Sequence, residues 1–128
     1  MSERFFYSAK VLDVIDGDTL DLLVDLGFNV HHQIRVRLNG INTPESRTTD
    51  LKEKELGLQA KTFTKDWTTR HKLVYVSTSK DKKEKFGRIL ALVYSDELKT
   101  ACLNQDLIES GNARAYHGEA RGGWFDTK

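Results

Sequence analysis

Apolar and polar residues alternate along the first third of the chain with the period of two that β-strands show. Residues 9–15, "AKVLDVI", and 19–26, "TLDLLVDL", are two such runs, and Asp16-Gly17-Asp18 lies between them. Asp-Gly between two apolar runs predicts a β-hairpin whose tight turn requires positive φ at both central residues. A third alternating run covers about residues 33–39. The pattern therefore predicts three short antiparallel strands.

The period then changes to that of a helix over about residues 55–70. One apolar stripe at helical spacing comprises Leu56, Ala60, Phe63 and Trp67. Because Gly57 is a poor helix former, we expect the helix to begin just after it. Two further strands are predicted at 73–77 and 88–94. A second helix follows and should end at Gly111; its apolar residues are Leu103, Leu107 and Ile108.

Five short strands with helices between and after them predict a small closed Greek-key barrel of the oligonucleotide-binding (OB) type. The fold class is thus α+β or mainly β, with two to three helices. A length of 128 residues with 38% hydrophobic content suits a single domain, residues 1–128. We expect a monomer.

No stretch approaches the ~20 apolar residues that a membrane-spanning helix requires. The N-terminal "MSERFFYSAK" lacks the apolar core and the small-residue cleavage site of a signal peptide. These features predict a soluble, intracellular protein that does not enter a membrane.

Charge and cysteine content narrow the function classes. The net charge is +1, so any signal for nucleic-acid binding must be local. The lysine-rich stretch "SKDKKEKFGR", residues 79–88, is one candidate, although its lysines alone fit a solvated loop better. A single cysteine excludes an internal disulfide, and neither it nor the four histidines show the spacing of a zinc site.

Two acidic residues, Asp18 and Glu45, occupy positions that suggest more than a surface role. Asp18 shares strand parity with the apolar row that begins at Leu20, and a carboxylate on that face needs a cation or hydrogen bonds. The alternative is an aspartate that only caps the turn. Pro44, the one proline, restricts Thr43 and so directs the Thr43 carbonyl and the Glu45 side chain, as a metal or catalytic site requires. An ordinary turn is the alternative here.

Three motifs in register resemble one family. The segments "VIDGDTL", "VRLNGINTPE" and "EKFGRILALVY", together with "LGLQAKTFTK", are similar to those of the staphylococcal nuclease (thermonuclease) family. The resemblance covers about residues 9–115. It implies an OB barrel and calcium-dependent hydrolysis of phosphodiester bonds in DNA, RNA or both.

The resemblance also implies a calcium site. It makes Asp18 and the carbonyl of Thr43 ligands of Ca²⁺, an ion that prefers hard oxygen donors. The family pattern has an aspartate ligand where this chain has Asn42. An amide oxygen can coordinate calcium, but it lacks the negative charge, so we expect weaker metal binding and reduced activity.

The remaining implied residues act on the substrate. Glu45 matches the glutamate that positions or deprotonates the attacking water, and Arg37 and Arg88 match the two arginines that grip the phosphate. Three positions are implied to contact the nucleotide, namely Lys85, Phe86 and Tyr116. A tyrosine is common in the family where Phe86 stands, so a hydroxyl contact is absent there.

One geometric conflict and one alternative function stay open. Strand parity puts Arg37 on the face opposite the apolar row to which Asp18 belongs, so a bulge or the curvature of the barrel must redirect one of them. The alternative function is a barrel of the same kind that binds nucleic acid or protein without cutting. Presence of Arg37, Glu45 and Arg88 together favours the enzyme.

Overall fold

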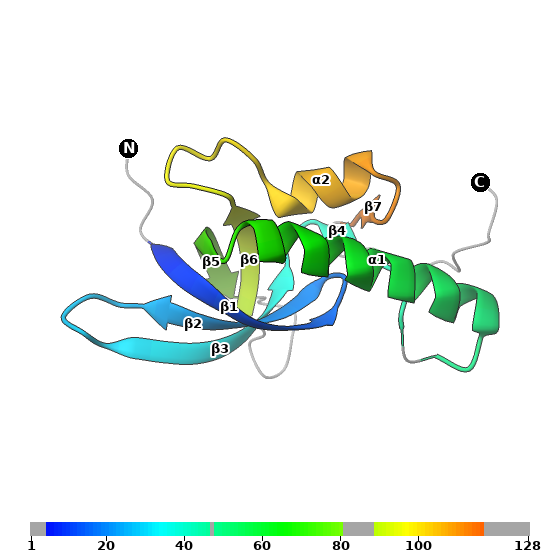
Figure 1. The fold of residues 1–128 in the computed structure, drawn as a ribbon, viewed down its shortest axis with the longest axis horizontal. Helices are drawn as coiled ribbons and strands as arrows, with labels where there is room; N and C mark the ends of the chain where they lie inside the picture. The colour runs from blue at the N-terminus through cyan, green and yellow to red at the C-terminus, as the bar shows by residue number, and fades with distance from the viewer. Residues whose placement is uncertain (1–4, 47, 81–88, 117–128) are drawn as a thin grey trace.

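The protein forms a closed five-stranded barrel with two helices packed outside it. The structure, a computed structural model, describes residues 5–46, 48–80 and 89–116. Around the barrel the strands follow the order β1-β2-β3-β6-β5 (Figure 1). Their bounds are β1 Phe6–Asp16, β2 Thr19–Asp25, β3 His31–Leu38, β5 Leu73–Lys80 and β6 Ile89–Tyr94. The predicted five-stranded barrel is confirmed.

Neighbouring strands run antiparallel except for β3 and β6, which pair in parallel. This parallel pair is the seam that closes the barrel, and Val36, Arg37 and Leu38 form its register on the β3 side. The sequence pattern predicted antiparallel pairing for the first three strands and made no prediction for the pairing of β3 with β6. Between β3 and β5 the chain passes through α1, which lies across β1 in Figure 1.

The first helix, α1, covers Leu51–Arg70 and so begins earlier than the sequence predicted. Asp50 is its N-cap, because the carboxylate accepts hydrogen bonds from the backbone N–H groups of Lys52 and Glu53. The expectation that Gly57 would mark the start is wrong: a strong cap seven residues upstream outweighs the low helix propensity of one glycine. The second helix, α2, covers Leu103–Glu109, and Gly111 follows it with φ +83°.

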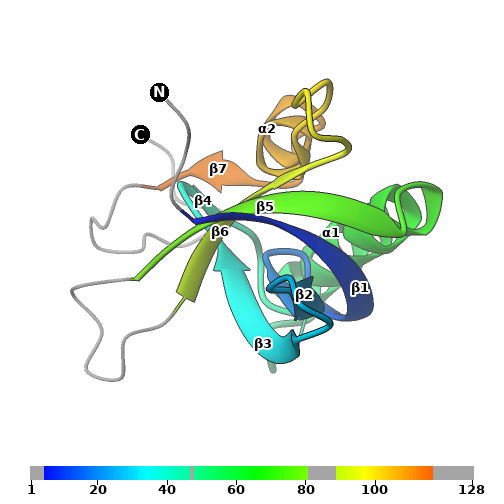
Figure 2. The same cartoon turned by 90° about the vertical axis from the view of Figure 1, so that its left-hand side faces the viewer.

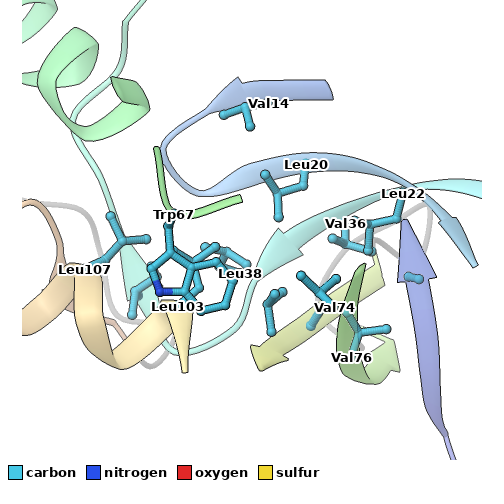
Figure 3. Packing of buried hydrophobic residues seen from close by; sticks show 14 of the residues in the cluster. Val14, Leu20, Leu22, Val36, Leu38, Trp67, Val74, Val76, Leu103 and Leu107 are labelled. Atoms are coloured by element: carbon cyan, nitrogen blue, oxygen red, sulfur yellow. The ribbon is translucent and has the colours of Figure 1, made fainter. Parts of the chain in front are cut away.

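The core lies inside the barrel and extends under the helices (Figure 3). Leu20, Leu22 and Val36 point inward from β2 and β3 and are fully buried. Trp67 from α1 packs with Leu103 and Leu107 from α2, and its indole N–H donates a 2.9 Å hydrogen bond to the Asp106 carboxylate. Burial along the predicted apolar stripe of α1 is uneven, because Leu56 and Phe63 are only half-buried. Thr64, which is not part of that stripe, is fully buried.

The β1–β2 hairpin forms as predicted, but its turn differs from the expected type. Neither Gly17 nor Asp18 has a positive φ. Gly17 is instead required by close packing, because a Cβ there would lie 2.8 Å from the Cβ of Ala60 on α1. Positive φ values occur in the β2–β3 turn, at Gly27, Phe28 and Asn29.

A second, two-stranded sheet was not predicted. It consists of β4, Ile41–Asn42, and β7, Arg114–Ala115, which pair antiparallel so that Asn42 lies opposite Arg114 (Figure 2). Strands of two residues are too short to show a period, so no sequence pattern could reveal them. Within the three described segments, no helix is long and apolar enough to cross a membrane.

Candidate active site

Asp18 is held by three hydrogen bonds, two of them from backbone N–H groups of other segments. It lies in the turn before β2, and its carbonyl accepts a 2.8 Å hydrogen bond from the Leu38 N–H at the end of β3. One carboxylate oxygen, Oδ1, accepts from the Thr19 hydroxyl at 3.1 Å, and the other, Oδ2, accepts from the Thr43 N–H at 3.3 Å. Only 8% of the residue is exposed. The buried carboxylate therefore has the hydrogen bonds that it needs, and they come from Thr43 as well as from the neighbouring Thr19, so Asp18 does more than cap its own turn.

Arg37 points at the same place from β3. Its Nη2 lies 3.7 Å from Asp18 Oδ2 and donates a 3.0 Å hydrogen bond to Asn42 Oδ1. Its guanidinium carbon is 5.6 Å from the centre of the Tyr116 ring, within the range of a cation–π contact. Only Nη2 takes part in the two polar contacts, and 19% of the side chain remains exposed. The guanidinium is therefore oriented by its neighbours while part of it faces solvent.

The parity conflict between Asp18 and Arg37 is resolved by where each residue stands. Thr19, the first residue of β2, is the one opposite Arg37. Asp18 lies just before the strand, next to an irregularity of the β1–β2 ladder between Val14 and Asp16, and its Oδ2 lies 3.7 Å from Arg37 Nη2. A carboxylate at this corner can reach the outward-facing guanidinium.

The segment from Asn42, the last residue of β4, to Ser46 carries three more of the predicted residues. Asn42 and Thr43 are buried, 6% and 2% exposed, and Pro44 is buried with a trans peptide bond. Glu45 is exposed; its backbone N–H donates to the Glu53 carboxylate on α1 at 3.3 Å. The Ser46 hydroxyl donates a short hydrogen bond to Asp16, which ties this segment to the β1–β2 hairpin.

The structure thus brings together Asp18, Arg37, Asn42 and Thr43, with Tyr116 against the guanidinium and Glu45 two residues beyond Thr43. Three predicted residues, Lys85, Phe86 and Arg88, lie outside the described residues. Sequence reasoning missed Ser46, whose role shows only when the two loops meet. It also missed the close packing of Gly57 against the Glu45–Ser46 peptide, because a glycine inside a helical stretch is usually interpreted as a helix boundary.

The donors gathered here suit a hard cation. They are the Asp18 carboxylate and the Asn42 amide oxygen, both of which face Arg37 Nη2 and are oxygen ligands of the kind that calcium prefers. The resemblance adds the Thr43 carbonyl, and the Thr43 N–H contacts Asp18 Oδ2. The set is poor in charge, however, since Asp18 supplies its one carboxylate. Across residues 5–46, 48–80 and 89–116, no group of three or more His, Cys, Asp or Glu side chains could hold a metal ion. The residue types therefore fit calcium, with a lower negative charge than two carboxylates would give.

Comparison with known proteins places this arrangement in a family. The sequence profile described as staphylococcal nuclease homologue matches residues 35–123. Two thermonucleases are each 36% identical to the chain, that of Staphylococcus hyicus over 106 residues and that of Staphylococcus intermedius over 109 residues. An uncharacterised protein of Bacillus anthracis is 32% identical over 103 residues.

The similarity covers most of this chain and a smaller share of its relatives. The matched regions are 83% and 84% of the chain, but only 57% and 59% of the two thermonucleases. For the Bacillus anthracis protein the shares are 80% and 44%. Both the extent of the profile match and the level of identity show common descent. The chain therefore belongs to the staphylococcal nuclease family.

Proposed function

We propose that this chain is a calcium-dependent nuclease that hydrolyses phosphodiester bonds in DNA, RNA or both. The observation that carries the proposal is the convergence of Asp18 and Arg37 on Asn42 and Thr43, because it combines oxygen donors for a cation with a guanidinium for a phosphate. The family membership and the thermonuclease relatives support the same reaction. The chain spans little more than half the length of those relatives. Its nuclease activity is therefore part of the proposal and is not taken over from them.

In this proposal Asp18, Asn42 and the Thr43 carbonyl hold Ca²⁺. When bound, the ion supplies Lewis-acid stabilisation of the charge that develops on the phosphate. Arg37 binds a non-bridging phosphate oxygen through its guanidinium, whose planar fork suits two oxygens at once. The contact of the Arg37 guanidinium with the Tyr116 ring orients it independently of the metal ligands, so less ordering is needed in the transition state.

Glu45 is proposed to take the proton from the attacking water. The water oxygen forms a bond to phosphorus, the bond to one ester oxygen breaks, and that displaced oxygen takes a proton from solvent. Glu45 is suited to this role because it is exposed and follows directly on the buried Thr43–Pro44 pair, which restricts its backbone. Arg88, which the resemblance makes a second phosphate ligand, and the nucleotide contacts Lys85, Phe86 and Tyr116 complete the proposal.

A second candidate function is binding of nucleic acid without cleavage. The Arg37–Asn42 hydrogen bond favours it, since a neutral amide replaces the metal-binding carboxylate usual in the family and engages the phosphate-binding arginine instead. Such a module would still hold a phosphate on Arg37. It would have no use for Glu45.

Cleavage of single-stranded DNA in calcium and in excess chelator separates the two functions. The chain, its Asn42→Asp variant and its Glu45→Gln variant should be compared over a range of calcium concentrations. For a nuclease we expect cleavage only with calcium, faster cleavage by Asn42→Asp, and a large loss in Glu45→Gln. If neither the chain nor Asn42→Asp cuts at any calcium concentration while both retain DNA binding, the binding module is the correct function.

A further inference from the structure

Gly57 is buried in the middle of α1, directly under the peptide that joins Glu45 to Ser46. A Cβ at position 57 would lie 2.3 Å from the Glu45 carbonyl oxygen, 2.4 Å from the Glu45 carbonyl carbon and 2.6 Å from the Ser46 nitrogen. All three distances are shorter than real Cβ contacts. Gly57 has no positive φ, so backbone conformation does not explain it. In a helix interior glycine is less favourable than alanine by about 1 kcal/mol, which leaves this close contact as the physical reason for the residue.

The same face of α1 also holds the turn that carries Asp18. Ala60 and Thr64 lie three and seven residues after Gly57, on the helix face that these spacings define. Ala60 packs against Gly17, and the Thr64 hydroxyl donates a 2.7 Å hydrogen bond to the Gly17 carbonyl. Both contacting residues are fully buried. One helix face therefore supports the two loops that bring the acidic residues to the site.

A direct link joins the two loops as well. The Ser46 hydroxyl donates to the carboxylate of Asp16, the residue just before Gly17. The loop with Glu45 is thus fixed at the helix by Gly57 and at the hairpin by Ser46. With two such contacts on adjacent residues, a shift at one of them moves the Glu45 backbone relative to Asp18.

We propose that Gly57 is a positioning residue of the active site, which sets where Glu45 stands relative to Asp18 by letting the Glu45–Ser46 peptide rest directly on α1. The inference rests on the proposed function in so far as Glu45 acts on the attacking water. Gly57 itself touches no substrate, and its effect on the reaction passes through Glu45.

The size of the effect follows from the contact distances. In Gly57→Ala, the Glu45 carbonyl oxygen must retreat from 2.3 Å to at least 3.0 Å from the new Cβ. A misplacement of about 1 Å at a catalytic group lowers the rate by about 10²-fold. We expect kcat of Gly57→Ala to fall by about 10²-fold and KM to stay within about threefold, because the phosphate-binding Arg37 is not displaced.

A double-mutant cycle tests whether Gly57 acts through Glu45. Cleavage of a single-stranded oligodeoxynucleotide in excess calcium should be measured for Gly57→Ala, Glu45→Gln and the double variant. We expect the double variant to be no slower than Glu45→Gln alone, because a misplaced base has no further effect once the base is gone. Multiplication of the two losses, or a kcat of Gly57→Ala within threefold of the parent, would overturn the proposal.

Two variants control for stability. Gly111→Ala strains a left-handed position in open space after α2 and leaves the Glu45 loop untouched, so it should lower the unfolding temperature without lowering kcat. If Gly57→Ala fails to fold by circular dichroism, Ser46→Ala replaces it in the cycle, since it removes the link to Asp16 and adds no atom at α1. We expect Ser46→Ala to lower kcat and to be non-additive with Glu45→Gln; an unchanged kcat or additivity would overturn the proposal.

A separate measurement distinguishes failure of the proposed nuclease function from failure of the Gly57 proposal. If neither the parent chain nor Asn42→Asp cleaves nucleic acid, the nuclease reaction is wrong, and a crystal structure of Gly57→Ala tests the positioning claim alone. We expect the Glu45 backbone to move relative to Asp18 by about 0.7 Å or more, the gap between 2.3 Å and 3.0 Å. Movement of α1 with the Glu45–Asp18 geometry unchanged, or no movement, would refute it.

Discussion

Replacement of Asn42 by aspartate tests the proposed metal site at its most unusual residue. Asn42 is 6% exposed, and its Oδ1 is the acceptor of the Arg37 hydrogen bond. Asp18 Oδ2 and Asn42 Oδ1 lie 3.7 Å and 3.0 Å from the same Arg37 nitrogen. Asn42→Asp is nearly isosteric, so it adds one negative charge beside Asp18 with little change of shape.

The magnitude follows from the partial burial of the site. At an effective dielectric near 20, two unit charges ~4 Å apart interact by ~4 kcal/mol, and a divalent ion doubles that attraction. Desolvation of the new carboxylate, loss of the amide dipole and neutralisation by Arg37 offset part of it. We expect a net gain of about 2–4 kcal/mol in calcium binding, which corresponds to a Kd about 30- to 700-fold lower.

Isothermal titration calorimetry measures this Kd directly, and thermal unfolding with and without calcium provides a second reading. In excess calcium each tenfold decrease in Kd adds about 1.4 kcal/mol to the free energy of unfolding. Asn29→Asp is the matched control, because it adds the same charge at the exposed β2–β3 turn, where Asn29 already has positive φ. A Kd of Asn42→Asp within threefold of the parent, or an equal gain in Asn29→Asp, would refute residue 42 as a calcium ligand.

Three further predictions concern single contacts. Arg37→Lys keeps the charge but loses the planar fork, so kcat/KM for DNA cleavage should fall by about 10²- to 10³-fold with unchanged circular dichroism; a loss below threefold would contradict the phosphate role. Asp106→Ala leaves the buried Trp67 indole N–H without its acceptor and should lower the free energy of unfolding in urea by about 1–3 kcal/mol, whereas Asp106→Asn should lose less; equal losses would contradict the hydrogen bond. The hydrogen bond from Arg35 lowers the pKa of the Asp21 carboxyl, so Arg35→Gln should raise that pKa towards its ordinary value in an NMR titration, and no rise would contradict it. Because the folded pKa is the lower one, this pair stabilises the fold above about pH 4 and stops doing so as pH falls through the folded pKa.

The barrel could be predicted because its strands show period two over long enough runs. Leu20 and Leu22 alternate with Asp21 and Leu23, and the first pair is fully buried as the pattern requires. Closure between β3 and β6 could not be predicted, since residues far apart in sequence meet there and no local pattern encodes a partner. The same limit explains β4 and β7, which are two residues each.

The residues of the candidate site that belong to sequence motifs could be predicted, whereas the residues that only support it through packing could not. The resemblance pointed to Asp18, Arg37, Asn42 and Thr43, and the structure brings these four residues into one place. Sequence periodicity alone separated Asp18 from Arg37, because it treated a turn residue as part of the strand. Gly57 was misinterpreted for a related reason: propensity scales describe an isolated helix, whereas this glycine is required by the loop above it.

A crystal structure of the chain with Ca²⁺ and a short single-stranded oligonucleotide tests the central claim most directly. We predict calcium bound by Asp18 and the Thr43 carbonyl, with Asn42 as a weaker ligand and a phosphate oxygen on the Arg37 guanidinium. Calcium or phosphate bound away from these residues, with the Arg37 contacts to Asp18 and Asn42 unchanged, would contradict the account.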